Sequence, residues 1–137
     1  MRGLAVIVLL GMTAIAAAES PDPVRANYLF GCRGCHLADG RGVPPEVPTL
    51  RDNLGTIVAR PGGRDYVVRV PGVLQSRLDD AELAAVLNYI LTEFNAATLP
   101  AGFRPYTARE VAAARKAILA DPHKYRRELF AGESATE

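Results

Sequence analysis

The sequence contains few residues of the types that most often bind metals or form disulfides. Its 137 residues include two cysteines, two histidines and two methionines, and both methionines, Met1 and Met12, lie near the N-terminus. The 16 basic and 15 acidic residues nearly balance, with a formal net charge of +1. This balance excludes the overall single-sign field that attracts nucleic acid or anionic lipid. A local charged patch that docks a partner is still compatible with it.

Long apolar runs are absent except at the N-terminus. Arg2 precedes an apolar run over residues 4–10, and small residues at 16–18 precede Glu19. This layout predicts a secretory signal peptide, residues 1–18, and therefore export to the periplasm. A membrane anchor is the alternative, but the apolar stretch is shorter than the roughly 20 residues that cross a bilayer. We expect no membrane span after signal cleavage.

Helix caps and apolar spacing predict a mostly α-helical chain. Asp22 before Pro23 is typical of a helix start, and this first helix should run to about Phe30. Asp79 and Glu82 have the spacing of a capping box. The helix that follows them carries apolar residues at intervals of three and four positions, namely Leu83, Val86, Leu87, Ile90 and Phe94.

The last third of the chain repeats this pattern. Thr107 and Glu110 again have capping-box spacing, ahead of apolar residues at helical intervals, Val111, Ala114 and Ile118. Asp121 before Pro122 predicts a last short helix, with apolar positions at Tyr125 and Leu129. Extended, alternating sequence occurs only at Tyr66–Val70, which predicts the one strand-like segment.

The segment between the first helix and the helix after Asp79 differs in composition. Residues 34–63 are dense in glycine and proline, which predicts loops with at most a short helix between them. Loops of such length inside a compact domain are usually functional or disordered. The segment contains little periodic apolar sequence of its own, so we expect a large apolar cofactor to supply the core that it lacks.

Both cysteines belong to one short motif, Cys32-Arg33-Gly34-Cys35-His36. C-x-x-C-H is the attachment sequence of c-type haem, in which both thiols form thioethers and the histidine binds the iron. A thioredoxin-like dithiol needs a βαβ pattern that is not visible here. Zinc needs about four ligands, and His123 is the one good donor left. A disulfide would close a very short loop and leave His36 unexplained.

With this motif in place, residues 22 to about 94 resemble the small monohaem cytochromes c of bacteria. The resemblance rests on the helix ending in C-x-x-C-H, the loop "ADGRGVPPEVPTL" and the helix "LDDAELAAVLNYILTEF". It implies a mostly α, cytochrome c-like fold wrapped around one covalent haem c. The expected organisation is a cytochrome domain at 19–98 and a helical C-terminal tail at 99–137.

The resemblance also implies a set of haem-binding residues. Cys32 and Cys35 should hold the haem, and His36 should bind its iron. In such proteins a proline carbonyl of the loop binds the other nitrogen of this histidine, and Pro48 is the residue expected in that role. Pro44 and Pro45 are the alternatives for this carbonyl.

The sequence departs from the family at the far side of the iron. Many members bind it there with a methionine that precedes a proline, whereas this chain has Val70 before Pro71. If the signal peptide is cleaved, no methionine remains. His123 is expected to be a solvated residue at a helix start rather than a ligand. Lys116, Lys124, a tyrosine, water or an empty position are the other possibilities.

Three further groups of residues have expected places around the haem. An apolar wall on the far side would comprise Val67, Val68, Val70 and Val73. Arginines that could pair with the haem propionates, or else be exposed loop charges, are Arg41, Arg51, Arg60 and Arg64. Aromatic residues expected where the two main helices cross are Tyr28, Phe30, Tyr89 and Phe94.

Two classes of function fit these observations. The first is a periplasmic one-electron carrier, and not an enzyme, that serves redox partners such as a dehydrogenase and a terminal oxidase. The second is a haem protein with an open or weakly ligated iron that binds small ligands, as a sensor or weak peroxidase. The far-side sequence has no histidine paired with an arginine to handle peroxide protons. We therefore expect the carrier.

Overall fold

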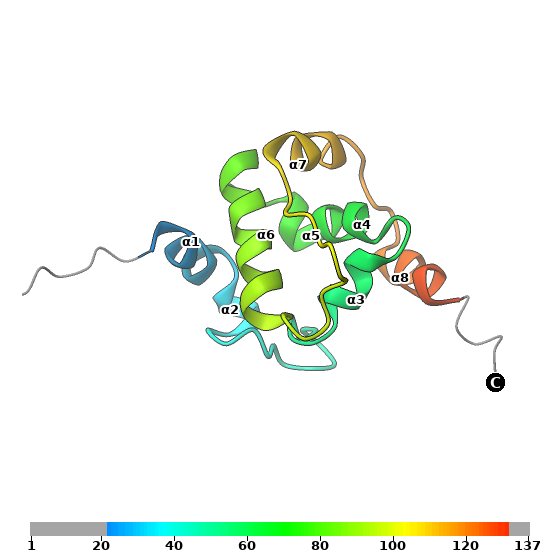
Figure 1. Ribbon diagram of the computed structural model, residues 1–137, viewed down its shortest axis with the longest axis horizontal. Coiled ribbons are helices and arrows are strands. Elements are labelled where there is room, and N and C mark those ends of the chain that lie inside the picture. The colour runs from blue at the N-terminus through cyan, green and yellow to red at the C-terminus, as the bar shows by residue number, and fades with distance from the viewer. Residues whose placement is uncertain (1–21, 132–137) are drawn as a thin grey trace, which may run out of the picture.

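The computed structural model describes residues 22–131, and these residues form eight helices (Figure 1). The helices are α1 (Pro23–Gly31), α2 (Arg33–His36), α3 (Leu54–Ala59), α4 (Gly63–Arg69), α5 (Pro71–Leu74), α6 (Asp80–Phe94), α7 (Ala108–Ala114) and α8 (Pro122–Phe130). The β pairing in this range is an isolated bridge between Val43 and Val47. The mostly α fold class is thereby confirmed. The predicted signal peptide, residues 1–18, lies outside the described residues.

The helices predicted to begin after Asp22 and after Asp79 are both present, as α1 and α6. The Asp22 carboxylate accepts a hydrogen bond from the backbone N–H of Val24 at 2.9 Å and so caps α1. At α6 the Asp79 carboxylate accepts from the backbone of Glu82 at 2.8 Å, and the Glu82 carboxylate accepts from the backbone of Asp79 at 3.0 Å. All five residues of the predicted apolar stripe of α6 are buried.

α1 packs across α6 (Figure 1), and aromatic rings fill the crossing. The rings of Tyr28, Tyr89 and Phe94 lie with their centroids 5.4–5.8 Å apart, in tilted or edge-on geometry that favours their quadrupoles. Tyr28 is fully buried. The placement of Phe30 in this crossing was wrong, because its side chain is 92% exposed. Residues two positions apart lie on opposite sides of a helix, so Tyr28 and Phe30 cannot both face α6.

The middle of the chain forms a core from its own side chains. Ile57 and Val58 of α3 and Tyr66, Val67 and Val68 of α4 are buried in one cluster with apolar residues of α6. The expectation that this segment has little apolar core material of its own is therefore wrong, whereas the contribution of a cofactor stays a prediction. The expectation failed because short helices of six and seven residues show too few turns for a periodic signal.

The strand predicted at Tyr66–Val70 is also wrong, because Gly63–Arg69 forms helix α4. β-branched residues favour strands only weakly, and burial against other elements routinely overrides that preference. Val68 is fully buried and Val67 and Tyr66 are nearly so, because α4 packs against α3, α7 and α8. A helix buried on several sides has a continuous apolar sequence, which resembles a strand.

The C-terminal segment packs into the same core as the helices before it. Tyr106, Val111, Ala114 and Leu119 are buried in the larger cluster. Ile118, predicted as an apolar position of the helix after Thr107, is 81% exposed because α7 already ends at Ala114. The division into a domain at 19–98 and a tail at 99–137 stays a prediction. No described helix has the length and apolar character needed to cross a membrane.

Arginine side chains fasten this segment to the rest of the chain. Arg64 donates from two nitrogens to the Glu110 carboxylate, at 2.6 and 2.8 Å, and this pairing lowers the pKa of Glu110. Glu110 therefore does not complete the predicted capping box, although Thr107 does accept the backbone N–H of Glu110 at 3.2 Å. Arg69 donates to the carbonyls of Ala117 and Ile118. These arginine contacts hold the C-terminal segment against α4.

Asn95 follows the last residue of α6 and is a polar residue whose side chain is fully buried. Its Oδ1 accepts from the backbone N–H groups of Asn53, Leu54 and Gly55, at 3.0, 2.9 and 3.4 Å. These N–H groups lie at the start of α3, where a helix has no internal acceptors. Its Nδ2 donates to the carbonyls of Leu50 and Ile90, at 2.7 and 3.1 Å. One side chain thus joins α6, α3 and the loop between α2 and α3.

We predict that Asn95→Ala lowers the free energy of unfolding by at least about 3 kcal/mol, because it leaves several buried backbone groups unpaired at about 1–3 kcal/mol each. Asn88→Ala is the matched control. Asn88 is half-buried and exchanges two hydrogen bonds with the backbone of Tyr106. Denaturant unfolding followed by far-ultraviolet circular dichroism measures both. A loss for Asn95→Ala no larger than that for Asn88→Ala would contradict the assignment.

Candidate functional site

The C-x-x-C-H motif occupies a tight helical junction between α1 and α2. The backbone N–H of Cys32 donates to the Tyr28 carbonyl at 2.9 Å and ends α1, and the N–H of His36 donates to the Cys32 carbonyl at 3.0 Å. Both cysteines have free thiols. Cys32 packs against the small aromatic cluster at the α1–α6 crossing, whereas Cys35 is exposed. One turn of backbone, held by these hydrogen bonds and by the packing of Cys32, therefore carries two thiols and one imidazole.

The imidazole of His36 is oriented by the loop that follows α2. Its Nδ1 lies 3.0 Å from the Pro48 carbonyl oxygen, and because a carbonyl can only accept, Nδ1 donates. The sequence reasoning named both residues, and the structure brings them together. Nε2 has no hydrogen-bond partner among the described residues and keeps its lone pair in this tautomer. The ring is thus held through one nitrogen and offers the other as a ligand.

The loop keeps this carbonyl in place by a close backbone approach at Gly42. The N–H of Gly42 donates to the His36 carbonyl at 3.0 Å, which places Gly42 directly beside the histidine. Gly42 has φ +64°, and a Cβ there would come within 2.6 Å of the carbonyl oxygens of Val47 and Pro48. Only glycine fits without displacing the carbonyl that His36 uses.

The loop is closed by backbone hydrogen bonds and rests on α6. Val43 and Val47 exchange two backbone hydrogen bonds, at 3.0 and 2.9 Å, and Leu50 donates to the carbonyl of Gly40 at 2.7 Å. Gly40, at φ +77°, lies so close to the Phe94 ring that a Cβ would approach it within 2.7 Å. Phe94 therefore limits the conformation of Gly40, which is hydrogen-bonded to the end of the loop that carries Pro48.

Tyr28 ties the end of the motif to the helix crossing. Its hydroxyl donates to the carbonyl of Leu37 at 2.6 Å, and Leu37 itself adopts a left-handed φ of 64°. Burial raises the pKa of Tyr28 to about 12, so the hydroxyl keeps its proton and its hydrogen bond at neutral pH. Tyr28 thus fixes the residue that follows His36. Sequence reasoning placed Tyr28 in the core but missed this bond.

The Cys32 thiol does not have the environment of a redox-active cysteine. A nucleophilic cysteine needs a lowered pKa, which a helix N-terminus or a neighbouring cation supplies. Burial instead raises the pKa of the Cys32 thiol. No cluster of three or more histidine, cysteine or acidic side chains that could hold a metal ion occurs in residues 22–131. Cys32, Cys35 and His36 together present two thiols and one imidazole on one short stretch of chain.

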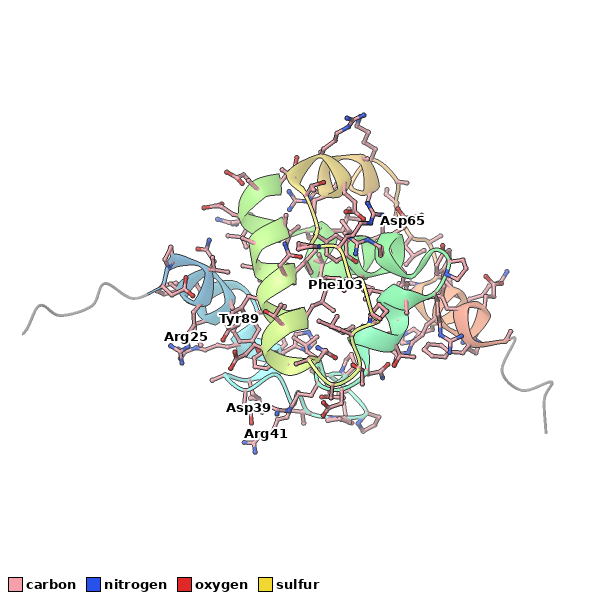
Figure 2. The ribbon with its side chains drawn as sticks, viewed as in Figure 1. Arg25, Asp39, Arg41, Asp65, Tyr89 and Phe103 are labelled. Carbon is pink, nitrogen blue, oxygen red and sulfur yellow. The ribbon has the colours of Figure 1, made fainter. Side chains whose placement is uncertain are left out.

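The four arginines proposed for the site separate into two pairs. Arg41 lies near Asp39 on the exposed loop, at 3.6 Å (Figure 2), and Arg51 donates to the Asp39 carbonyl at 2.8 Å. Arg60 donates to the Leu129 carbonyl and Arg64 pairs with Glu110, so both contact the C-terminal segment. Only the first pair belongs to the loop that carries Pro48.

The valines proposed for the far side gather at one cluster, whereas the candidate ligands lie on the surface. Val67 and Val68 are buried in the larger cluster, and the partly buried Val70 and Val73 pack against it. His123 is exposed in the first turn of α8, which lies on the opposite side of the molecule from α2 (Figure 1). The remaining nitrogen candidates, Lys116 and Lys124, are exposed. The structure does not bring His123 to His36.

Comparison with known proteins finds two similar curated sequences. Cytochrome c-552 from one strain of Thermus thermophilus is 36% identical over 128 aligned residues, covering 80% of this chain and 83% of the relative. A second Thermus thermophilus sequence, also named cytochrome c-552, is 37% identical over 104 residues, covering 63% of this chain and 79% of the relative. No family model matches the chain.

We predict that Gly42→Ala destabilises the protein by at least about 2 kcal/mol, because the new Cβ combines left-handed strain with a backbone clash. It should also weaken the His36 hydrogen bond, which is visible as an upfield shift or loss of the Nδ1 proton resonance. Gly72→Ala is the control, since a Cβ at Gly72 meets nothing within 4 Å. Its effect should stay within about 0.5 kcal/mol. Equal behaviour of the two variants would disprove the proposed role of Gly42.

Proposed function

This chain belongs to the bacterial c-type cytochromes and binds haem c covalently, and from that premise we propose that it is a periplasmic one-electron carrier between redox proteins. The observation that supports it most directly is the pairing of His36 Nδ1 with the Pro48 carbonyl at 3.0 Å. This contact orients an imidazole one residue after a pair of thiols and leaves Nε2 unpaired. Such an arrangement suits a permanent iron ligand that does not exchange during turnover.

The donor set fits covalent haem. We assign the two thioether bonds to Cys32 and Cys35, which lie on one helical turn and form no disulfide, and the iron bond to Nε2 of His36. Thiol addition to vinyl groups needs access to the sulfur atoms, and Cys35 is exposed while Cys32 is partly so. A thioether carries no charge, so a thiol whose ionisation is disfavoured by burial, as at Cys32, loses nothing on attachment.

When bound, haem iron supplies a reversible one-electron couple whose potential depends on ligands, hydrogen bonds and burial. The chain's own contribution is to keep His36 still and to set its donor strength. The Pro48 carbonyl makes the imidazole a stronger donor by accepting its Nδ1 proton in a hydrogen bond. Gly42 and Tyr28 hold the residues on either side in place. We assign no catalytic residue, because the proposed role is to pass on an electron rather than to convert a substrate.

Small-ligand binding is the second candidate function, and one observation favours it. Both methionines of the sequence lie within the first 12 residues, and α8, with His123, lies away from α2 (Figure 1). Residues 22–131 thus contain no methionine, and their one histidine besides His36 lies on a helix away from α2. An iron with an open or weakly held sixth position can take small molecules such as carbon monoxide or nitric oxide.

The proposed location follows from the N-terminal sequence. A signal peptide at residues 1–18 would direct export and leave a mature chain with a cytochrome domain at 19–98 and a helical segment at 99–137. Attachment of haem c outside the cytoplasm suits this route. The partners would be a donor such as a periplasmic dehydrogenase and an acceptor such as a terminal oxidase.

We predict that Cys32→Ala/Cys35→Ala abolishes covalent haem. Haem staining after denaturing electrophoresis should show colour on the wild-type chain and none on the double variant. Gly34→Ala is the control within the motif, because a Cβ at Gly34 meets nothing within 4 Å, and it should keep its stain. Colour that acid acetone extracts from the wild-type protein would show that the attachment is not covalent.

We further predict that the mature protein lacks histidine–methionine ligation. Its ferric spectrum should show no sulfur-to-iron band at the red end, and His123→Ala should leave the spectrum and spin state unchanged. Lys124→Ala, an adjacent exposed position, is the control. A change from low-spin to high-spin iron in His123→Ala alone would identify His123 as a ligand. Rapid carbon monoxide binding by the untreated ferrous protein would favour the small-ligand function over the carrier.

A further inference from the structure

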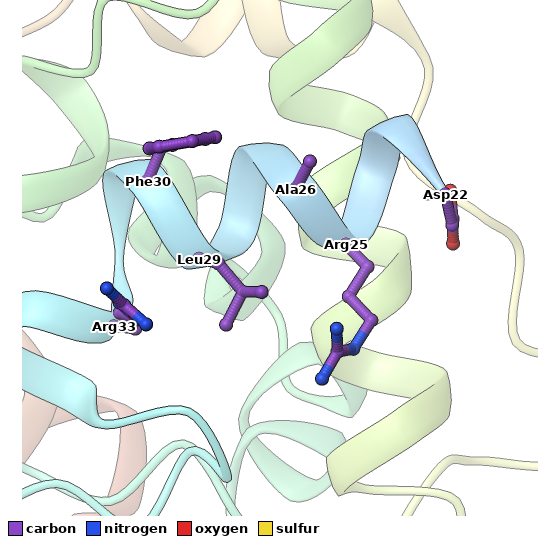
Figure 3. Close-up of a pocket in the computed structure, with 6 residues that line it drawn as sticks. All are labelled: Asp22, Arg25, Ala26, Leu29, Phe30 and Arg33. Carbon is purple, nitrogen blue, oxygen red and sulfur yellow. The ribbon is translucent and has the colours of Figure 1, made fainter. Parts of the chain in front are cut away.

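Helix α1 has two distinct faces. The inner face, with Val24, Tyr28 and then Cys32, packs against α6, and Leu29 at the boundary contacts both this packing and the outer hollow. The outer face carries residues at intervals of three and four positions, which form one continuous stripe along a helix. These six residues line a shallow hollow of about 310 Å³ (Figure 3): Asp22, Arg25, Ala26, Leu29, Phe30 and Arg33. The stripe ends beside the first haem-attachment cysteine.

The centre of this outer face is apolar. Phe30 is 92% exposed, the most exposed of the large apolar residues in the described chain. Single exposed apolar residues are common on protein surfaces, but Phe30 adjoins Ala26 and Leu29 around the same hollow. An exposed aromatic in such a setting is typical of protein–protein contact sites.

The rim of the outer face is positive. Arg25 and Arg33 are both exposed, and neither forms an ion pair with another described residue. The one acid of the stripe, Asp22, uses its carboxylate to cap the backbone of Val24. Some other arginines are paired, as Arg64 is with Glu110 and Arg115 with Asp80. Two arginines without an ion pair therefore flank the apolar centre of this face, although the whole chain is nearly neutral.

We propose that the outer face of α1 docks an acidic electron-transfer protein. The partner would place an apolar group in the hollow against Phe30 and carboxylates around Arg25 and Arg33. This inference rests on the proposed carrier function, because only a redox partner gains from docking beside Cys32. A second copy of this chain is a poorer occupant, since a symmetric contact would place the same arginines opposite each other.

Kinetics of electron transfer test the proposal. The probe is a purified, oxidised, acidic blue-copper protein, mixed with the reduced holoprotein by stopped flow at several salt concentrations. The wild-type rate constant should fall as salt rises, because attraction between opposite charges is screened. Arg25→Glu/Arg33→Glu should lower the low-salt rate constant by about tenfold or more and reverse the salt dependence. Phe30→Ala should lower the rate constant even at high salt.

A matched charge change elsewhere is the control. Arg109 in α7 and Arg127 in α8 are exposed, and Arg109→Glu/Arg127→Glu changes the net charge by the same amount. Its rate constant should fall by less than about threefold. All variants must keep the wild-type spectrum and reduction potential, so that the driving force is constant. Equal loss in the two charge variants, or no effect of Phe30→Ala, would overturn the docking proposal.

Three further measurements distinguish failure of the carrier function from binding of a second copy or of lipid at this face. Spectroelectrochemical titration of the wild-type protein tests the carrier function itself, because a protein without a reversible one-electron couple fails there before docking is considered. Sedimentation velocity that shows a dimer lost in Phe30→Ala would assign the face to a second copy. Binding to phosphatidylglycerol vesicles that is lost in Arg25→Glu/Arg33→Glu, without a kinetic effect, would assign it to lipid. Either assignment would replace the redox partner.

Discussion

The crossing of α1 over α6 is the contact on which the haem-binding side of the molecule depends. Tyr28, fully buried there, contacts Phe94 and holds the Leu37 carbonyl. Phe94 in turn limits how Gly40 can be placed, and the Phe94 carbonyl accepts a hydrogen bond from Asp52 at 3.0 Å. The thiols, the imidazole and the loop that orients it are thus all attached to the C-terminal end of α6. A shift of α6 along α1 would move His36 and Pro48 together.

The described residues contain two hydrophobic clusters with different structural roles. The smaller one, at the helix crossing, fixes the haem-attachment motif, and Cys32 packs against it. The larger one joins α3, α4 and α6 with the C-terminal segment. Leu54 and Leu78 contact both clusters, so the two cores are not independent. Asn95 adds a polar link, because its five hydrogen bonds connect α6 to α3 and to the loop. Order on the haem side is therefore coupled to packing around α4.

The sequence predicted those parts of the structure that depend on local rules. Caps at Asp22 and Asp79 depend on side chains that bond to backbone a few residues away, and both are present. Short helices α3 to α5 could not be predicted in this way, since tertiary contacts rather than periodicity stabilise them. Glu110 shows the same limit at one residue: its capping-box spacing is correct, but Arg64, 46 positions away, binds its carboxylate instead.

At the site, the motif identified the ligand residues but not what keeps them in position. Pro48 was predicted from a family resemblance, whereas Gly42, Tyr28 and Asn95 act through contacts that no local pattern encodes. Phe30 was misplaced because its apolar character alone suggested the helix crossing, although α1 has a second apolar face. That second face has a physical consequence. An aromatic ring left in water at 92% exposure adds almost nothing to the stability of the isolated chain, and under the docking proposal it contributes when a partner's surface covers it. The same short helix would then serve both of a carrier's needs, with Tyr28 on its inner side holding the haem-binding segment rigid and Phe30 on its outer side bringing a partner close to it.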